Sequence, residues 1–314
     1  MSTSSNVHPG TQFNVTHPLT HHTGTSLRPG RLLLGLVFSS GIGLLAYKRR
    51  SLTRGGALGA MATGTTIFGL GGWSWGLSLI YFFLSSTLLS HFREKEKAST
   101  AADKFSKDAQ RDLAQVAANG GVASLYAAAS GSLRSEPAQR ILAAGFAGAL
   151  ATATADTWAT ELGVLSLQKP RLITSGPPVA PGTSGGITPL GLSASALGAF
   201  TLGLVFWLTS GLRRSRATLP WISLVSGLAG SLCDSLLGAT VQAMYFCPTC
   251  RCETERAIHS CGTATQPLRG ISWCNNDVVN AFATLAGSLA AIVLSAGPHL
   301  ITSLVKKPRP RPKL

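Results

Sequence analysis

Acidic residues lie inside long apolar stretches of this chain, where a charge is costly. Asp156 and Glu161 lie in the apolar run that ends at Gly163, and Asp234 lies in a stretch rich in glycine and serine. Asp277 opens the last apolar stretch. A carboxylate at bilayer depth costs about 2.5–3.5 kcal/mol on insertion scales and usually faces an ion, a partner or a polar cavity. We therefore predict that these four acids are catalytic, with Asp156 and Asp234 as metal ligands. Buried ion pairs or protonated acids are the alternative.

Helix geometry constrains how two of these acids can act together. Thr152, Asp156 and Thr160 are four residues apart and share one helical face. Glu161 follows Asp156 by five residues, so a straight helix turns it about 140° away. Both carboxylates can serve one site only if the helix ends near Gly163 or a neighbouring loop folds back. Asp156 is therefore the safer candidate for a buried site.

A glycine-rich segment between two apolar runs could bind phosphate. Such a turn before a helix offers free backbone N–H groups to an anion. The segment lacks the Gly-Lys-Ser/Thr ending of a Walker A loop, and an ordinary loop between helices is the alternative. The residues that we assign to phosphate or nucleotide binding here are Gly182, Thr183, Ser184, Gly185 and Gly186.

Asparagines near the ends of apolar runs supply further polar groups. Asn119 is four residues after Gln115, so the two share a helix face, although a helix C-terminus capped at Asn119 is the alternative. Asn276 and Asn280 flank Asp277, and together they supply more polar side chains than a helix N-cap alone requires. We predict that these three asparagines bind the cofactor. Carboxylates for Mg²⁺, amides and phosphate-binding glycines together favour phosphoryl transfer from a nucleoside triphosphate.

The composition indicates a polytopic membrane protein. The chain has 314 residues, of which 45% are hydrophobic and only 12% are charged, against a usual charged share of about 25%. Its 35 glycines suit close packing of membrane helices. The net charge of +15 fits contact with anionic lipid headgroups. We exclude nucleic acid as a partner because no nucleic-acid motif accompanies the charge.

The apolar runs predict an all-α bundle of about seven to nine spans, since about 20 apolar residues cross a bilayer. We expect a disordered tail over 1–30, one transmembrane domain over 31–304 with a surface helix near 93–117, and a basic tail over 305–314. The predicted helices and apolar runs are 31–47, 55–72, 73–91, 119–133, 140–165, 187–210, 219–246 and 278–304.

Five of the six cysteines lie between Cys247 and Cys274, which indicates local chemistry. The pair Cys247 and Cys250 has the spacing of half a structural zinc site, which Cys252, His259 or Cys261 could complete. The second half lacks the paired spacing of a zinc ribbon. Zinc, disulfides in a lumenal loop and free thiols all stay open, with zinc the least favoured.

Several blocks of the sequence, in order, resemble one membrane family. They are Ser85-Ser86, Arg111-Asp112 with Gln115-Val116, Asn119–Gly121, Ala155–Gly163, Pro170–Thr174, Pro181–Gly186, Gly230–Ala239, Gln242 and Asn276–Asn280. The family is that of transmembrane protein 19 and the plant phytyl phosphate kinase. The resemblance implies phosphorylation of an isoprenoid monophosphate to the diphosphate, with CTP or ATP as donor. It places the metal and nucleotide at Asp156, Glu161, Asp234 and Asp277, and phosphate at Gly182, Thr183, Gly185 and Gly186.

Two other functions fit the same residues. In an ion- or proton-coupled transporter, Asp156, Glu161 and Asp234 would relay protons or bind a cation, and broken helices suit such proteins too. In a membrane scaffold, these acids would have no role in function. For location, we expect a multi-pass protein of an endomembrane such as the endoplasmic reticulum, with the plastid or mitochondrial envelope as alternatives. Membrane lipids and the isoprenoid phosphate are the expected partners.

Overall fold

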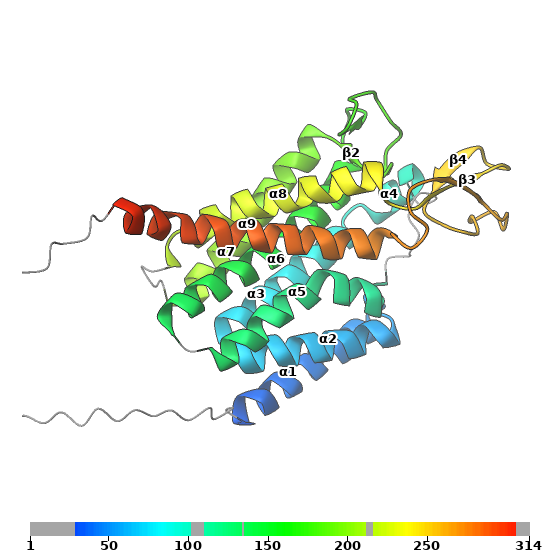
Figure 1. Cartoon of the computed structure of the whole chain (residues 1–314). Coiled ribbons are helices and arrows are strands. Elements are labelled where there is room, and N and C mark those ends of the chain that lie inside the picture. The colour runs from blue at the N-terminus through cyan, green and yellow to red at the C-terminus, as the bar shows by residue number, and fades with distance from the viewer. Residues whose placement is uncertain (1–28, 102–109, 134, 212–215, 306–314) are drawn as a thin grey trace, which may run out of the picture.

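Long helices lie side by side in the computed structural model, and two small strand elements lie at one end of the bundle (Figure 1). The structure describes residues 29–101, 110–133, 135–211 and 216–305. The helices are α1 Pro29–Lys48, α2 Arg54–Thr66, the π-helix η1 Ile67–Gly71, α3 Trp73–His91, α4 Glu94–Ala101, α5 Leu113–Ser132, α6 Glu136–Gly163, α7 Pro189–Thr209, α8 Leu219–Thr240 and α9 Asn276–Val305. The predicted all-α bundle is confirmed.

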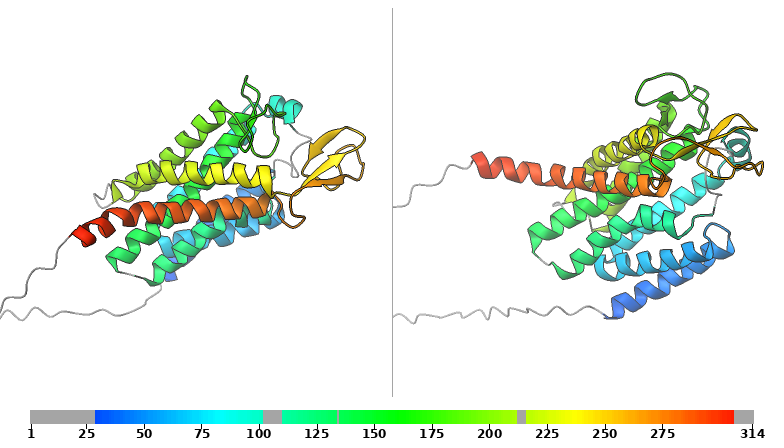
Figure 2. Two further views of the ribbon diagram at one scale, coloured as in Figure 1. Left: turned by 45° about the horizontal axis from the view of Figure 1, so that its top comes forward. Right: turned by 45° about the vertical axis from the view of Figure 1, so that its right-hand side comes forward.

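The strands belong to two loops. β1 Arg171–Leu172 pairs antiparallel with β2 Gly186–Ile187 in the connection from α6 to α7. Between α8 and α9, β3 Met244–Cys247, β4 Cys252–Thr254 and β5 Gln266–Arg269 form a sheet in the order β4-β3-β5. This second element projects from the bundle in both views of Figure 2.

Within the described residues, four helices are long and apolar enough to cross a membrane. They are Pro29–Lys48, Pro189–Thr209, Leu219–Thr240 and the part of α9 from Asn276 to Gly297. The first lies at one edge of the bundle, against α2 and η1 (Figure 1). The predicted number of spans is broadly compatible with this set together with the shorter or less apolar helices around α6.

Helix α6 forms the centre of the bundle and packs against α3, α5, α7, α8 and α9. Every residue from Ala143 to Ala155 is buried, and most of these residues are alanine, glycine or threonine. Small residues let helix backbones approach closely, which is how membrane helices gain packing contacts. Within this stretch, the Phe146 ring lies 4.3 Å from Trp75 and 5.2 Å from Phe206, centroid to centroid.

The segment before α5 differs from the prediction. The surface helix expected near 93–117 is represented by α4, and residues from Leu113 onward belong to α5, while 102–109 lie outside the described residues. Asp112 and Gln115 form a capping box: Gln115 N donates to Asp112 Oδ1 at 2.9 Å, and Asp112 N donates to Gln115 Oε1 at 3.1 Å. Asn119 therefore lies inside a helix, so the alternative of a C-terminal cap at Asn119 is wrong. Of the predicted tails, 1–28 and 306–314 also lie outside the described residues.

A glycine of α6 and a glycine of α5 should respond very differently to substitution by alanine. A Cβ at Gly148 would lie 2.5 Å from the Gly287 carbonyl oxygen of α9, whereas a Cβ at Gly121 has open space around it. Gly148→Ala should destabilise the protein by about 1–3 kcal/mol through overpacking. Gly121→Ala should be neutral or stabilise by up to about 1 kcal/mol. Thermal unfolding of the purified protein in detergent measures both, and equal melting temperatures would contradict this packing.

Candidate functional site

Three helices meet at Thr152, and this contact sets the register of the acids. A Cβ at Gly230 of α8 would lie 2.2 Å from Thr152 Oγ1, and one at Gly287 of α9 would lie 1.9 Å from it. Asp156 and Asp234 each follow one of these contact residues by four positions, which is one helical turn. Both therefore lie on the side of this contact where α8 ends and α9 begins (Figure 1).

The structure brings the predicted metal ligands together. The Asp156 carboxylate interacts electrostatically with that of Asp234, and so does the carboxylate of Glu255 from the loop between α8 and α9. Asp234 Oδ2 is buried and has no hydrogen-bond partner among the described residues. Two interacting carboxylates, one with an unpartnered buried oxygen, form an arrangement that a divalent cation would stabilise.

The glycine-rich loop lies one turn beyond Asp234. Ser184 Oγ donates to Gln242 Oε1 at 2.9 Å, and Arg269 donates to the Gly238 carbonyl at 2.8 Å and to the Ser184 carbonyl at 3.4 Å. A Cβ at Gly238 would lie 2.5 Å from Ser184 Oγ, so the glycine allows this approach. Gln242 Nε2 in turn donates to Glu255 Oε1 at 2.7 Å. These contacts join the loop, the end of α8 and the Glu255 segment into one polar cluster.

Some backbone amides of the loop already donate hydrogen bonds within the loop's own turns. Gly182 and Gly185 have φ values of 77° and 82°, which favour glycine. The Thr183 amide donates to Ala180 O at 3.1 Å, and the Gly186 amide donates to Thr183 O at 3.0 Å. Phosphate binding by residues 182–186 stays a prediction, and in this conformation the amides of Thr183 and Gly186 are already used.

The start of α9 carries Asn276, Asp277 and Asn280, of which Asp277 and Asn280 lie only about 60° apart around the helix. Asn275 caps the helix, because Val278 N donates to its Oδ1 at 3.1 Å, so Asn276 belongs to the first turn. Asn280 is buried and precedes Gly287 by seven residues, which places it on the face toward Thr152. Asp277 precedes Thr284 by seven residues, and Thr284 Oγ1 donates to the Ala118 carbonyl of α5 at 3.2 Å. Asp277 therefore lies on the face toward α5.

Glu161 lies in a different polar cluster from Asp156. Its Oε1 accepts a hydrogen bond from Ser90 Oγ at 2.6 Å, and its Oε2 forms an ion pair with Lys97 Nζ. Arg111 donates to Ser90 Oγ at 3.5 Å and interacts electrostatically with Glu161. The structure does not bring Asp156 and Glu161 together, because α6 stays helical to Gly163 and turns them about 140° apart. The predicted catalytic role of Glu161 stays a prediction.

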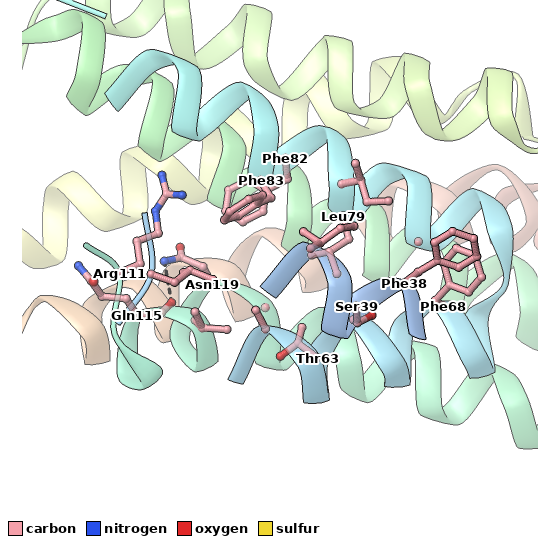
Figure 3. Close-up of a pocket in the computed structure, with 18 residues that line it drawn as sticks. Phe38, Ser39, Thr63, Phe68, Leu79, Phe82, Phe83, Arg111, Gln115 and Asn119 are labelled. Atoms are coloured by element: carbon pink, nitrogen blue, oxygen red, sulfur yellow. Dashed lines mark hydrogen bonds between the residues drawn. The ribbon is translucent and has the colours of Figure 1, made fainter. Parts of the chain in front are cut away.

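An apolar pocket opens between α1, α2, α3 and α5. The space has a volume of about 840 Å³, part of it open to the outside. Figure 3 shows Arg111, Gln115 and Asn119 at one end, Phe82 and Phe83 in the middle, and Phe38 and Phe68 at the other end. Burial lowers the pKa of Arg111, and the Glu161 carboxylate opposes that shift.

The polar end of the pocket lies on the same side of the bundle as the acids. Ala118, next to Asn119, accepts the hydrogen bond from Thr284 of α9. Thr284 is in turn three residues from Gly287, which contacts Thr152. Asn119 is thus placed at the pocket, near the start of α9, and its predicted role in cofactor binding stays a prediction.

Sequence reasoning missed three residues of the cluster: Gln242, Glu255 and Arg269. The family resemblance includes Gln242 without a role, although it follows Asp234 and Gly238 at helical intervals of four. Glu255 and Arg269 lie beyond the helix in the cysteine-containing loop, and no periodic pattern links them to α8. Their contacts with Gln242 and Gly238 depend on the fold of that loop.

Comparison with known proteins identifies relatives. The chain matches the family described as integral membrane protein DUF92 over residues 37–288. It is 32% identical to Protein PGR of Arabidopsis thaliana over 284 residues, which cover 84% of this chain and 96% of that protein. It is 29% identical to the uncharacterized membrane protein MJ0933 of Methanocaldococcus jannaschii, over 84% of this chain and 94% of that protein. No solved structure matches the chain.

The Lys97–Glu161 pair should be coupled more strongly than a surface pair. The two side chains are 10% and 22% exposed, whereas those of Arg93 and Glu96 are 52% and 50% exposed. In a double-mutant cycle with Lys97→Met and Glu161→Gln, we expect a coupling free energy of about 2 kcal/mol. The same cycle at Arg93 and Glu96 should give at most about 0.5 kcal/mol. Thermal or denaturant unfolding measures both couplings, and similar values for the two pairs would contradict the burial of Glu161.

Proposed function

The chain belongs to the DUF92 family of multi-pass integral membrane proteins, and we propose that it is a metal-dependent kinase of isoprenoid monophosphates. The observation that carries the proposal is the meeting of Asp156 and Asp234, from two helices, beside Glu255 and one turn from the 182–186 loop. Phosphoryl transfer depends mainly on positioning and on neutralising charge. A cluster of acids next to a small-residue loop, at the end of a membrane bundle, suits that task for a lipid substrate.

The acids fit a bound Mg²⁺ ion. Asp156 and Asp234 would hold it, because Mg²⁺ takes one or two carboxylates and completes its shell with water and substrate phosphates. The buried, unpartnered Oδ2 of Asp234 supports this assignment, since such an oxygen otherwise loses its hydration without compensation. When bound, the ion would neutralise charge on the donor phosphates.

The surrounding residues would position the reactants. Gln242 holds Glu255 through its amide nitrogen and Ser184 through its amide oxygen, so the loop and the acids are fixed relative to each other. Arg269 ties the same loop to α8. In the proposed reaction, an oxygen of the lipid monophosphate forms a bond to the terminal phosphorus of the nucleoside triphosphate. The bond from that phosphorus to the bridging oxygen breaks, so a nucleoside diphosphate leaves and a lipid diphosphate forms.

The apolar pocket would hold the isoprenoid tail. Its lining is mainly aromatic and aliphatic, and its one guanidinium and two amide side chains gather at one end (Figure 3). Arg111 is the cation at that end, and a guanidinium suits the two-point binding of a phosphate. The tail would lie toward Phe68 and the lipid phosphate near Asn119, on the side where α9 begins and the acids lie.

Replacing either acid of the pair should abolish product formation. In purified protein with an isoprenoid monophosphate, Mg²⁺ and CTP or ATP, we expect a diphosphate product. Asp156→Asn and Asp234→Asn should each lower kcat/KM by at least about a hundredfold, equivalent to about 2.7 kcal/mol of transition-state stabilisation. Chromatography of the lipid products measures the reaction.

Glu136→Gln is the matched control, because Glu136 is an exposed carboxylate at the opposite end of the same helix. It should keep the activity of the unmodified protein. A folded protein that makes no diphosphate with any combination of donor and isoprenoid phosphate would overturn the proposal. Cation or proton flux into proteoliposomes that is lost in Asp156→Asn, without lipid phosphorylation, would favour the transporter alternative.

Filling the pocket should discriminate between substrates by tail length. Ala60 lines the pocket from α2, so Ala60→Phe places a ring where the tail would lie. We expect kcat/KM to fall about tenfold for a long-chain isoprenoid monophosphate and to change little for a short-chain one. Leu58→Phe is the control, because Leu58 is on the same helix and 67% exposed. Equal effects of Ala60→Phe on both chain lengths would place the tail elsewhere.

A further inference from the structure

The loop between α8 and α9 gathers four side chains that bind soft metal ions. One ligand atom from each of Cys247, Cys250, His259 and Cys261 lies within 4.8 Å of the others. Cys247 ends β3, Cys250 lies in the turn after it, and the other two belong to a tight turn before β5. Residues distant in the loop therefore converge on one point.

The separations match those around a tetrahedral zinc ion. The Sγ atoms of Cys247 and Cys261 are 3.7 Å apart, and His259 Nδ1 lies 3.2 Å from Cys261 Sγ. With Zn–S bonds of about 2.3 Å and Zn–N bonds of about 2.0 Å, tetrahedral angles give about 3.8 Å between sulfurs and about 3.5 Å from nitrogen to sulfur. A disulfide would require about 2.05 Å between the sulfurs.

The local backbone shapes the site. The Cys250 amide points at Cys247 Sγ, 3.4 Å away, and the next residue, Arg251, has a φ of 52°, so the chain turns sharply after the first pair. On the other side, the amide of Gly262 donates to His259 O at 2.8 Å, and that glycine has a φ of 82°. These two turns present their ligands toward each other.

His259 is held in a ligating orientation. It is only 3% exposed, and its Nε2 lies 3.4 Å from Cys252 Sγ while its Nδ1 faces Cys261. Histidines that bind zinc commonly use their second nitrogen to donate to a neighbouring group, which fixes the ring. Cys252 would be that neighbour and not a fifth ligand.

We propose that Cys247, Cys250, His259 and Cys261 form a structural zinc site. Four protein ligands close the coordination shell, which is typical of structural and not catalytic zinc. The strands around the site are only three or four residues long, and β5 is mostly exposed. An element this small buries too little apolar surface to fold by itself and commonly needs a metal or disulfides.

The zinc site would hold Glu255 and Arg269 against α8. Glu255 lies between the two pairs of ligands and accepts the hydrogen bond from Gln242, and Arg269 ends β5 and donates to Gly238. The zinc would thus fix the loop that completes the acidic cluster. This inference stands on the loop alone, and it holds whether or not the protein is a kinase.

Metal analysis of the full-length protein tests the proposal. Protein purified in detergent without a polyhistidine tag should contain about one zinc per chain by mass spectrometry. Cys250→Ser and His259→Ala should each lose most of it, while Cys274→Ser and Cys233→Ser should retain it. Cys274 is buried and Cys233 lies within α8, so these controls remove a thiol without removing a ligand.

A second measurement covers variants that fail to fold. The unmodified protein, exchanged into cobalt, should show the visible absorption of a tetrahedral cobalt–thiolate site, and chelation should make the 244–269 segment more sensitive to protease. Unmodified protein that contains no zinc and shows no tetrahedral cobalt spectrum would overturn the proposal. So would fewer than six reactive thiols after denaturation without reductant, which would indicate a disulfide, or iron in place of zinc.

Discussion

The close approach of α6 to its neighbours is the constraint on which the rest of the structure depends. From Ala143 to Ala155 the helix is buried at every position, so each of its faces contacts another helix. Only small residues allow this, and at Gly148, Gly230 and Gly287 even a methyl group would collide with a neighbour. Since water-driven burial contributes little between helices in a membrane, such contact is a main source of their association. It also fixes the distance between groups on α6 and α8.

This packing brings acidic side chains close together. The close packing of α6 and α8 places Asp156 near Asp234, and Glu255 is a third acidic group that interacts with Asp234. In a low-dielectric site, like charges this close cannot all stay ionised without compensation. Arg269 uses its guanidinium on two carbonyl oxygens, of Gly238 and Ser184, so its hydrogen bonds go to the loop and not to the acids. A bound cation would compensate the repulsion between these carboxylates. The packing that brings the acids together would then also form the proposed cation site.

Local rules predicted the helices and part of the site, and they failed where contacts depend on the tertiary fold. Helical spacing placed Asp156 on one face with Thr152 and turned Glu161 away, and the structure has that arrangement. The same rules misplaced the start of α5. They put residues up to 117 in a surface helix, whereas Asp112 and Gln115 form a capping box that begins α5 at Leu113. Gln242 and Glu255 could not be paired from sequence, since their contact depends on a short sheet whose order is not sequential.

Helix α6 separates two polar clusters of different character. On one face, Asp156 interacts with Asp234, which also interacts with Glu255 from the loop between α8 and α9. On the other face, Glu161 is neutralised by Lys97 and supported by Ser90 and Arg111, all from within the bundle. Lys97 neutralises Glu161 within the fold, whereas a bound cation would compensate the charges of Asp156 and Asp234. The loop that supplies Glu255 has only short strands and would depend on the proposed zinc for its fold. The acidic cluster would therefore be complete only in protein whose loop is zinc-bound, so metal supply could control the site through a segment outside the membrane helices.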